Sequence, residues 1–400
     1  MMNFIKDVFD HDLGTLIAMA VGYLGGKALE KVYDAAIDKA FSHISEKYRK
    51  KKFKKLYDAH EKLVIEKHNI MPIDHADPFY EHTDIEIINT GKKFCLDCPE
   101  PYKQQIKMKR NDINFERDFF FSKYTGLEDL DEITGIGGLA ELIVKHKEIT
   151  GQWFLNELDK AYPIFNGKKF GIYSIRSHRL RETEDAGLSI EFYETDYFTH
   201  KVMRSVYQEL KSLNHPICNM KTYPVEGIDH LRPFMTSFGV NTFLIVYSEK
   251  GDKSIVFAKR SKRTANTRES IWHVTMNEGL SFTDIEGKDI SLVKCLHRGL
   301  NEELGIKEHY YKDIEKEKFM DLFLVMDNFE VGISSVVVMD ASEDKIKDLH
   351  SIAKDSVLET EEICAVDFNS RDINRFISEN KCTSACLYTL SMVMLRKRYL

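Results

Sequence analysis

Two adjacent carboxylates are the residues of this sequence best suited to chemistry. Glu302 and Glu303 stand side by side near the end of residues 289–306, one helical turn after Arg298. Carboxylate oxygens held on a rigid element bind hard divalent cations such as Mg²⁺, which in turn bind the phosphates of a substrate. The pair therefore predicts a metal-phosphate site. The alternative interpretation is a solvated helix face on which Arg298 pairs with Glu302.

The residues around this pair predict the helix that must position it. Leucines recur every four residues through 289–306, which gives the helix one apolar face for packing on a core. Asp289 or Ser291 can cap its first turn, and Gly305 follows the last leucine as a stop signal. The carboxylates of Glu302 and Glu303 are expected at the polar end of this helix.

Residues 298–306 resemble the second half of the Nudix box, whose family pattern is Arg-Glu-aliphatic-x-Glu-Glu-x-Gly-aliphatic. The flanking sequence is similar to the same family in its order of elements, which covers about residues 238–380. This order is a hairpin over 241–260, a tryptophan strand over 271–276, and later strands over 319–327, 331–340 and 363–368. The resemblance implies an α+β or α/β fold in which the C-terminal domain is a Nudix-like α/β/α sandwich.

The same resemblance implies a function. A Nudix domain binds a nucleoside-diphosphate-type ligand and hydrolyses it with Mg²⁺ or Mn²⁺. By position, Glu302 and Glu303 are the expected catalytic residues and metal ligands, and Arg298 is expected to orient them. The first glutamate of the pattern is replaced by Gly299. A catalytically inactive nucleotide sensor of Nudix homology is therefore the alternative to a hydrolase.

Three acids before the helix are candidates for the missing ligand. Glu278, Asp284 and Glu286 lie in the loop that would carry the first half of the box. The family spacing is not reproduced there, because Gly279 and Glu286 are one residue too far apart. We expect Glu278 to act as a catalytic residue and Glu286 as a metal ligand.

Basic residues after the second strand of the hairpin are candidates for phosphate contacts. Arg260, Arg263 and Arg268 lie in or beside the loop that is near the substrate in the resembled family. Arginine binds phosphate through paired hydrogen bonds. The alternative is a solvated basic loop.

Composition limits the classes of protein. The chain has 400 residues, 43% of them hydrophobic, which suffices for roughly two or three domains. A net charge of −7 gives no general attraction to nucleic acid, so specific nucleic-acid binding is not expected. Seven cysteines without a cleavable signal pattern indicate a cytoplasmic protein with free thiols. Cys95 and Cys98 form a single Cys-x-x-Cys pair, which is a weak zinc signal.

The first residues of the chain predict a separate role. Residues 13–26 are a charge-free, glycine-containing run, shorter than the roughly 20 residues of a helix that spans a bilayer. A basic cluster follows over 47–55. Two interpretations stay open for residues 1–55, a homo-oligomer interface and a peripheral membrane contact.

We expect four segments along the chain. A helical region covers 1–70, and an irregular or helical region with several prolines covers 71–165. A strand-containing region over 166–237 precedes or extends the Nudix-like sheet, and the Nudix-like domain itself covers 238–400.

Overall fold

The computed structural model describes residues 70–73, 84–119, 127–160, 164–180, 185–219, 225–261, 271–354, 360–397 and 400. These residues belong to one compact unit, His60–Leu400. The apolar run, the basic cluster, Arg263 and Arg268 lie outside the described residues. Among the described helices, none combines the length and the hydropathy that a bilayer crossing requires.

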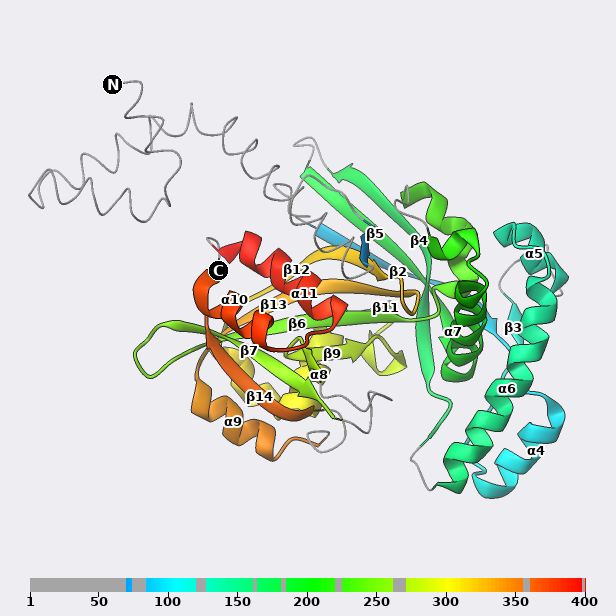
Figure 1. Cartoon of the computed structure of the whole chain (residues 1–400), viewed down its shortest axis with the longest axis horizontal. Helices are drawn as coiled ribbons and strands as arrows, with labels where there is room; N and C mark the ends of the chain where they lie inside the picture. The colour runs from blue at the N-terminus through cyan, green and yellow to red at the C-terminus, as the bar shows by residue number, and fades with distance from the viewer. Residues whose placement is uncertain are drawn as a thin grey trace, which may run out of the picture. The chain divides into compact units, whose positions relative to one another are not determined.

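A mixed sheet of eight strands forms the centre of the C-terminal part (Figure 1). Six strands follow the order β1-β12-β13-β6-β7-β14, while β8 pairs with β7 and β9 pairs with β6. Strands β13 and β6 are parallel, and the other pairs in this sheet are antiparallel. The strands are β1 (Ile70–Pro72), β6 (Phe238–Tyr247), β7 (Lys253–Arg260), β8 (Trp272–His273), β9 (Met276–Gly279), β12 (Ile314–Val325), β13 (Glu330–Ser342) and β14 (Thr360–Asp367).

Helices cover both faces of this sheet. On one face, Ser334 of β13 lies with its Oγ 3.3 Å from Thr389 Oγ1 of helix α11 (Ser384–Leu395). The neighbouring Ser335 points the opposite way, since side chains alternate along a strand, and it contacts Thr242 of β6. That second face shares a core with the leucines of α8 (Leu292–Leu304). Helices α9 (Glu343–Ser351) and α10 (Ser370–Glu379) contact α8 and β14 respectively. The expected α/β/α arrangement is therefore confirmed.

A second sheet of four strands lies before the first in the chain. Its order is β3-β2-β5-β4, with β2 (Asp84–Cys95), β3 (Asp118–Phe119), β4 (Lys168–Leu180) and β5 (Asp185–Asp196). Strand β2 was not expected, because the prolines around it favoured irregular structure over the alternation of Ile85 and Ile87. Strands β4 and β5 pair with each other, and β5 pairs with β2. They therefore belong to the smaller sheet and are not further strands of the eight-stranded sheet.

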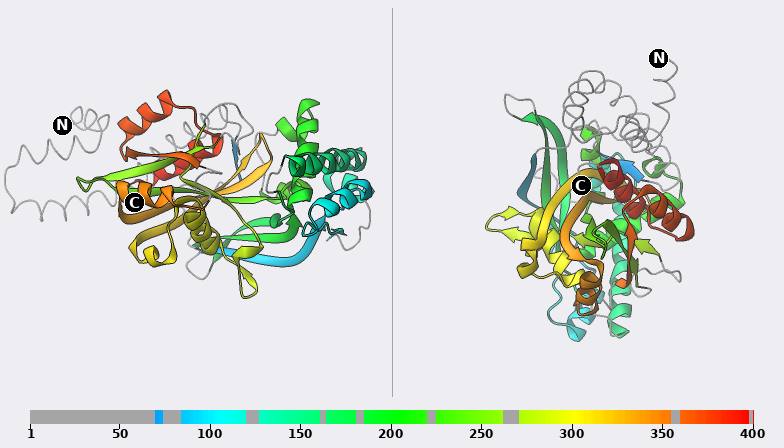
Figure 2. Two further views of the ribbon diagram at one scale, coloured as in Figure 1. Left: turned by 90° about the horizontal axis from the view of Figure 1, so that it is seen from below. Right: turned by 90° about the vertical axis from the view of Figure 1, so that its left-hand side faces the viewer.

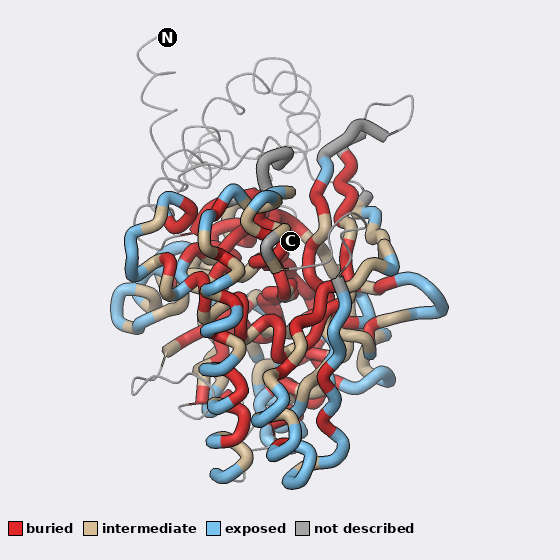
Figure 3. Tube along the Cα trace, turned by 90° about the vertical axis from the view of Figure 1, so that its right-hand side faces the viewer, coloured by how far each residue is buried: buried red, intermediate tan, exposed pale blue. Residues whose placement is uncertain are grey.

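Four helices accompany the smaller sheet. They are α4 (Glu100–Lys109), α5 (Glu128–Thr134), α6 (Leu139–Asp159) and α7 (Tyr197–Ser212). Figure 2 shows them gathered at the end of the unit away from α10 and α11. Their apolar sides pack inward, as Figure 3 shows by the buried segments that run through both sheets while exposed residues occupy turns and outer helix faces.

The two sheets share one hydrophobic core. Phe192 of β5 meets Phe238 of β6 with ring centroids 5.2 Å apart. Phe170 of β4 stacks on Phe282, in the loop before α8, at 4.8 Å and an interplanar angle of 5°. The smaller sheet thus contacts the loop that precedes the box-like helix, which matters for the site.

Candidate functional site

Helix α8 forms as its sequence predicts. Ser291 caps the first turn by accepting a hydrogen bond from the backbone N–H of Lys294 at 3.1 Å. Gly305 ends the helix with φ 70°, a conformation that glycine adopts without strain. The four leucines of its apolar face are all buried. Asp289 belongs to a short strand, so Ser291 rather than Asp289 is the cap.

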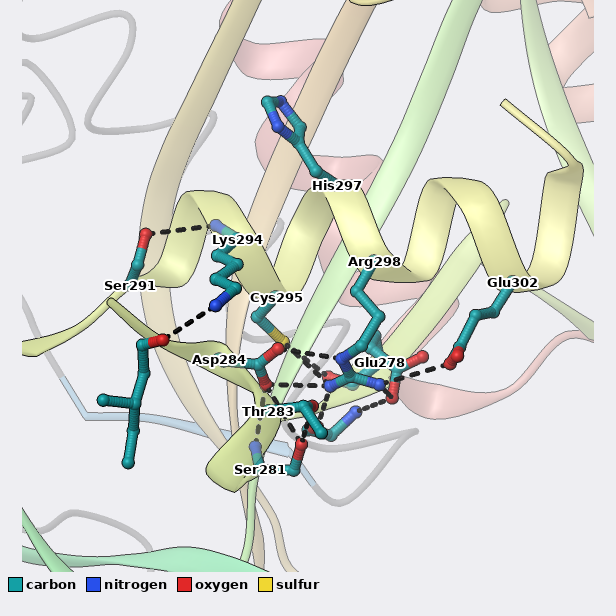
Figure 4. Close-up of polar contacts among 12 residues, drawn as sticks. Glu278, Ser281, Thr283, Asp284, Ser291, Lys294, Cys295, His297, Arg298 and Glu302 are labelled. Atoms are coloured by element: carbon teal, nitrogen blue, oxygen red, sulfur yellow. Dashed lines mark hydrogen bonds and ion pairs between the residues drawn. The ribbon is translucent and has the colours of Figure 1, made fainter. Parts of the chain in front are cut away.

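Arg298 stands at the centre of an acidic cluster (Figure 4). Its Nε and Nη2 atoms each donate to a carboxylate oxygen of Asp284 at 2.8 Å. Nη1 lies 2.8 Å from Glu278 Oε1 and 3.4 Å from Glu302 Oε2, and Nη2 also donates to the backbone oxygen of Gly279 at 2.9 Å. The guanidinium therefore draws together acids from the loop, from β9 and from its own helix.

The environment keeps Arg298 charged. Burial by itself would lower the pKa of Arg298, but the hydrogen bonds to Asp284 and the charge of Glu278 hold it above its ordinary value. Asp284 is fully buried and also accepts from the backbone N–H of Ser281 at 2.8 Å. This contact completes a capping box in the short helix η3 (Phe282–Asp284). The loop before α8 is thus folded tightly onto Arg298.

Gly299 is required by packing. A Cβ atom built on it would lie 2.5 Å from the Met276 sulfur and 2.9 Å from the Glu278 Cβ. Strand β9 therefore lies directly against α8 at this turn, and the first glutamate of the family pattern has no room at this position. The helix can carry its two later acids only.

The two later acids have different surroundings. Glu303 is buried, with 6% of its surface exposed, and its Oε1 accepts from the backbone N–H of Asn277 at 3.1 Å. Glu302 lies nearer the surface, where its Oε1 is 3.0 Å from Lys354 Nζ. Consecutive helical residues point about 100° apart, which explains the divergence. The two carboxylates thus have separate partners, and their joint binding of a cation stays a prediction.

Glu286 is not brought to this cluster. It is exposed on the short strand β10 (Ile285–Glu286), opposite Asp289 of β11 (Asp289–Ile290). The hairpin carries Glu286 outward, away from Arg298, and its role as a metal ligand stays a prediction. Of the three loop acids, Glu278 and Asp284 reach Arg298.

These residues do not fit the divalent cation that the resemblance implies. Gly299 leaves the family's first glutamate without room, and the two later acids turn to different partners, Glu303 to the Asn277 backbone and Glu302 to Lys354. Within the described ranges, no group of three or more His, Cys, Asp or Glu side chains is arranged to hold a metal ion. Mg²⁺ or Mn²⁺ as a cofactor stays a prediction from the resemblance.

A cavity of about 150 Å³ lies beside the cluster. It brings together two residues that the sequence singled out, Arg260 at the end of β7 and Glu303 of α8. The other polar residues of the lining were not predicted, because a single His, Asn or Thr in a strand belongs to no sequence motif. The lining consists of Ala258, Arg260, His273, Val274, Asn277, Glu303 and Thr360.

Asn277 orients the charged groups of this cavity. Its Oδ1 accepts from Arg260 Nη2 at 3.3 Å, and its Nδ2 donates to Asn241 Oδ1 at 2.6 Å. His273 is buried, and burial together with the charge of Arg260 holds the pKa of His273 well below its ordinary value. The lining of the cavity therefore includes a guanidinium, a neutral imidazole and the Glu303 carboxylate.

The Cys-x-x-Cys pair is buried. Cys95 and Cys98 are free thiols, and burial raises the pKa of both, that of Cys98 to about 12. Zinc binds the thiolate form, which burial disfavours. Both thiols lie in the core, and zinc binding by this pair stays a prediction.

The comparisons give structural resemblance alone. No family model and no curated protein sequence matches this chain. A mutT/nudix family protein from Listeria innocua is similar at 13% identity and a TM-score of 0.28, over 41% of this chain and 94% of that one.

Two further crystal structures are similar at the same level. The NUDIX domain of Shewanella oneidensis NrtR, complexed with ADP ribose, has 13% identity and a TM-score of 0.24, over 41% of this chain and 88% of that chain. A MutT/nudix family protein from Enterococcus faecalis has 11% identity and a TM-score of 0.23, over 39% of this chain and 60% of that chain. Values of this size carry no inference about activity.

Proposed function

We propose that residues 238–400 form a Nudix-like domain that binds a nucleoside-diphosphate-type ligand and acts as a sensor. The observation that carries this proposal is the cavity shared by Arg260 and Glu303. The order of β6, β7, β8, β9 and α8 supports it, because this order matches the family whose box remnant spans 298–306.

The charges of the cavity suit one end of such a ligand. Arg260 supplies paired donors for a phosphate, and the Glu303 carboxylate can accept from a ribose hydroxyl. A volume of about 150 Å³ is smaller than the roughly 300–1,000 Å³ of a typical small-molecule site. The cavity therefore takes a phosphate or a single ring, while the rest of the ligand lies outside it.

Binding without hydrolysis follows from the acid cluster. The helix lacks a carboxylate at position 299, and Arg298 engages Glu278 and Glu302. Metal-dependent hydrolysis of a diphosphate needs acids that are available to cations. A hydrolase remains the second candidate, favoured by the retained pair Glu302–Glu303.

Calorimetry on the full chain tests the proposal. The panel is ADP-ribose, nucleotide sugars, dinucleotides and nucleoside triphosphates, each with and without Mg²⁺, with product formation followed in parallel. Arg260→Ala is expected to weaken binding at least about tenfold, the loss of a charged contact of roughly 1.4 kcal/mol or more. Lys259→Ala is the matched control, since Lys259 is the neighbour on β7 and pairs with Glu362 at 3.0 Å.

Two outcomes count against the sensor. If no compound binds with a dissociation constant below about 1 mM, or if Arg260→Ala binds like the wild type, the cavity is not the ligand site. If a compound is turned over with Mg²⁺ and turnover is lost in Glu302→Gln, the hydrolase is correct.

We also propose that such a sensor controls residues 1–55, as an oligomer-forming or membrane-associated effector. The proposal rests on the apolar run 13–26 and the basic cluster 47–55. Liposome flotation of the chain against a variant lacking residues 1–30 tests the membrane version. Equal flotation of the two would exclude it, and a concentration-dependent mass by light scattering would favour the oligomer.

A further inference from the structure

The acidic cluster around Arg298 has more carboxylates than one guanidinium can neutralise. Asp284 takes two hydrogen bonds from Arg298, and Glu302 has a second partner in Lys354, whose side chain is 72% exposed. Glu278 lies 2.8 Å from the same guanidinium and has only 17% of its side chain exposed. A second positive charge close to Glu278 would lower the electrostatic cost of this half-buried group of acids.

The smaller sheet brings that charge. Lys169 of β4 forms an isolated antiparallel bridge with Ser281, in the loop that holds Asp284. A Cβ built on Gly279 would lie 3.3 Å from the Lys169 Nζ, which places the ammonium beside the residue that follows Glu278. Burial lowers the pKa of Lys169, and the charges of Glu330 and Glu278 act against that effect.

Packing on both sides of Lys169 determines its position. Phe170 stacks on Phe282 at 4.8 Å, and Lys168 Nζ lies 5.3 Å from the centre of the same ring. Phe282 is the first residue of η3, which ends at Asp284. The loop is therefore held by Arg298 from α8 and by residues 168–170 from the smaller sheet.

We infer that Lys169 is a built-in counter-ion of this cluster, which acts beside Arg298 and takes the place of the divalent cation that a Nudix-like domain would otherwise hold there. An ammonium and a guanidinium present between them up to eight N–H donors to the carboxylates. A divalent cation would have to enter beside the Lys169 ammonium in addition to Arg298, and this added positive charge repels it. The cluster therefore keeps its shape without metal.

This inference concerns the acid cluster and does not depend on what the neighbouring cavity binds. Residues 238–400 supply the acids and Arg298, whereas Lys169 comes from β4 of the smaller sheet. The ligand site and the smaller sheet are thereby linked through one ion-pair cluster.

Manganese binding to the full chain tests the inference. Free Mn²⁺ is counted by electron paramagnetic resonance, and the thermal midpoint is measured in EDTA and in excess Mn²⁺. Wild type and Glu278→Gln are expected to bind the same amount of Mn²⁺, because the cluster holds none. The thermal midpoint of the wild type is expected to differ by less than about 1 °C between EDTA and excess Mn²⁺. Lys169→Met removes one counter-ion and is expected to gain an Mn²⁺-dependent rise of about 3 °C or more.

Two matched variants complete the design. Lys168→Met removes the neighbouring ammonium, which lies 3.5 Å from Glu116 and 5.3 Å from the Phe282 ring centre, and is expected to gain no Mn²⁺ response. Adding Glu278→Gln to Lys169→Met is expected to abolish the gain. Stoichiometric Mn²⁺ binding by the wild type that Glu278→Gln removes would overturn the inference, and so would a folded Lys169→Met without any gain. The wild-type measurement decides the question even if Lys169→Met does not fold.

Discussion

Arg298 holds Asp284 through two parallel hydrogen bonds of 2.8 Å, from Nε to Oδ1 and from Nη2 to Oδ2. Asp284 is fully buried, so this paired contact forms away from water, where it is strong and where breaking it is costly. It joins the loop before the box-like helix to the helix itself. The acids near the candidate site are thus organised around a side-chain cation.

Replacing Asp284 by Asn is expected to destabilise the protein by about 3 kcal/mol, because it leaves a partly buried guanidinium short of a charge partner. Urea unfolding at pH 7.5 measures the change in free energy. Asp344→Asn is the control, since the Asp344–Lys347 pair at 3.3 Å is largely exposed, and it is expected to cost less than about 0.5 kcal/mol. Equal effects of the two substitutions would contradict this role for Asp284.

Replacing Gly299 by Ala is expected to destabilise α8 by about 1–3 kcal/mol, although alanine is the better helix former. The added Cβ would meet the Met276 sulfur at 2.5 Å and the Glu278 Cβ at 2.9 Å, and Met276 is itself buried. Chemical denaturation measures the loss.

Two further variants separate this clash from a general effect of alanine. Gly137→Ala is expected to be nearly neutral, because nothing lies within 4 Å of a Cβ at that position. The double variant Gly299→Ala with Met276→Ala is expected to lose less stability than the sum of the two single losses, because removing the Met276 side chain relieves the clash. Strict additivity would argue against the contact.

Stability is expected to fall as the pH drops below about 6.5, the ordinary pKa of histidine. Burial, with the charges of Lys169, Arg204 and Lys201, holds the pKa of His200 well below that value, so His200 stays neutral in the folded chain. The nearby acid is Glu330, whose Oε1 lies 3.7 Å from the His200 Nε2. The unfolded chain binds the proton, so the stabilisation is present above about 6.5 and is lost toward acid, at about 1.4 kcal/mol per pH unit for one group.

Urea unfolding between pH 7.5 and 5.5 measures this dependence. His200→Gln is expected to flatten the slope by about one proton relative to the wild type. His273, whose pKa is also held low by burial, contributes a slope of the same sign that remains in this variant. An unchanged slope in His200→Gln would show that His200 titrates alike in both states.

Replacing Arg260 by Lys is expected to weaken phosphate-ligand binding by about five- to tenfold while keeping the charge. Lysine lacks the planar pair of donors and cannot keep the 3.3 Å contact to Asn277 in the same geometry. Calorimetry compares it with Arg260→Ala. If the lysine variant binds like the wild type, the cavity attracts its ligand by charge alone.

Local pattern predicted the elements that carry the site. The leucine spacing, Ser291 and Gly305 of α8 act within a few residues of one another, so their effect does not depend on the rest of the chain. The strands β6, β7, β12 and β13 were predicted for the same reason, from runs of apolar residues. Strand β2 was missed, because the prolines around it favoured irregular structure and its parallel partner β5 lies far along the chain.

By itself the sequence determined which helix presents Glu302 and Glu303 and in what order the strands surround it, because periodicity and caps are local. The tertiary structure alone decided the partners of those acids. It placed Asp284 rather than Glu286 on Arg298, turned Glu303 into the core, and brought Lys169 from another sheet to Gly279. Loop closure and sheet packing set these contacts, and neither leaves a trace in the spacing of residues.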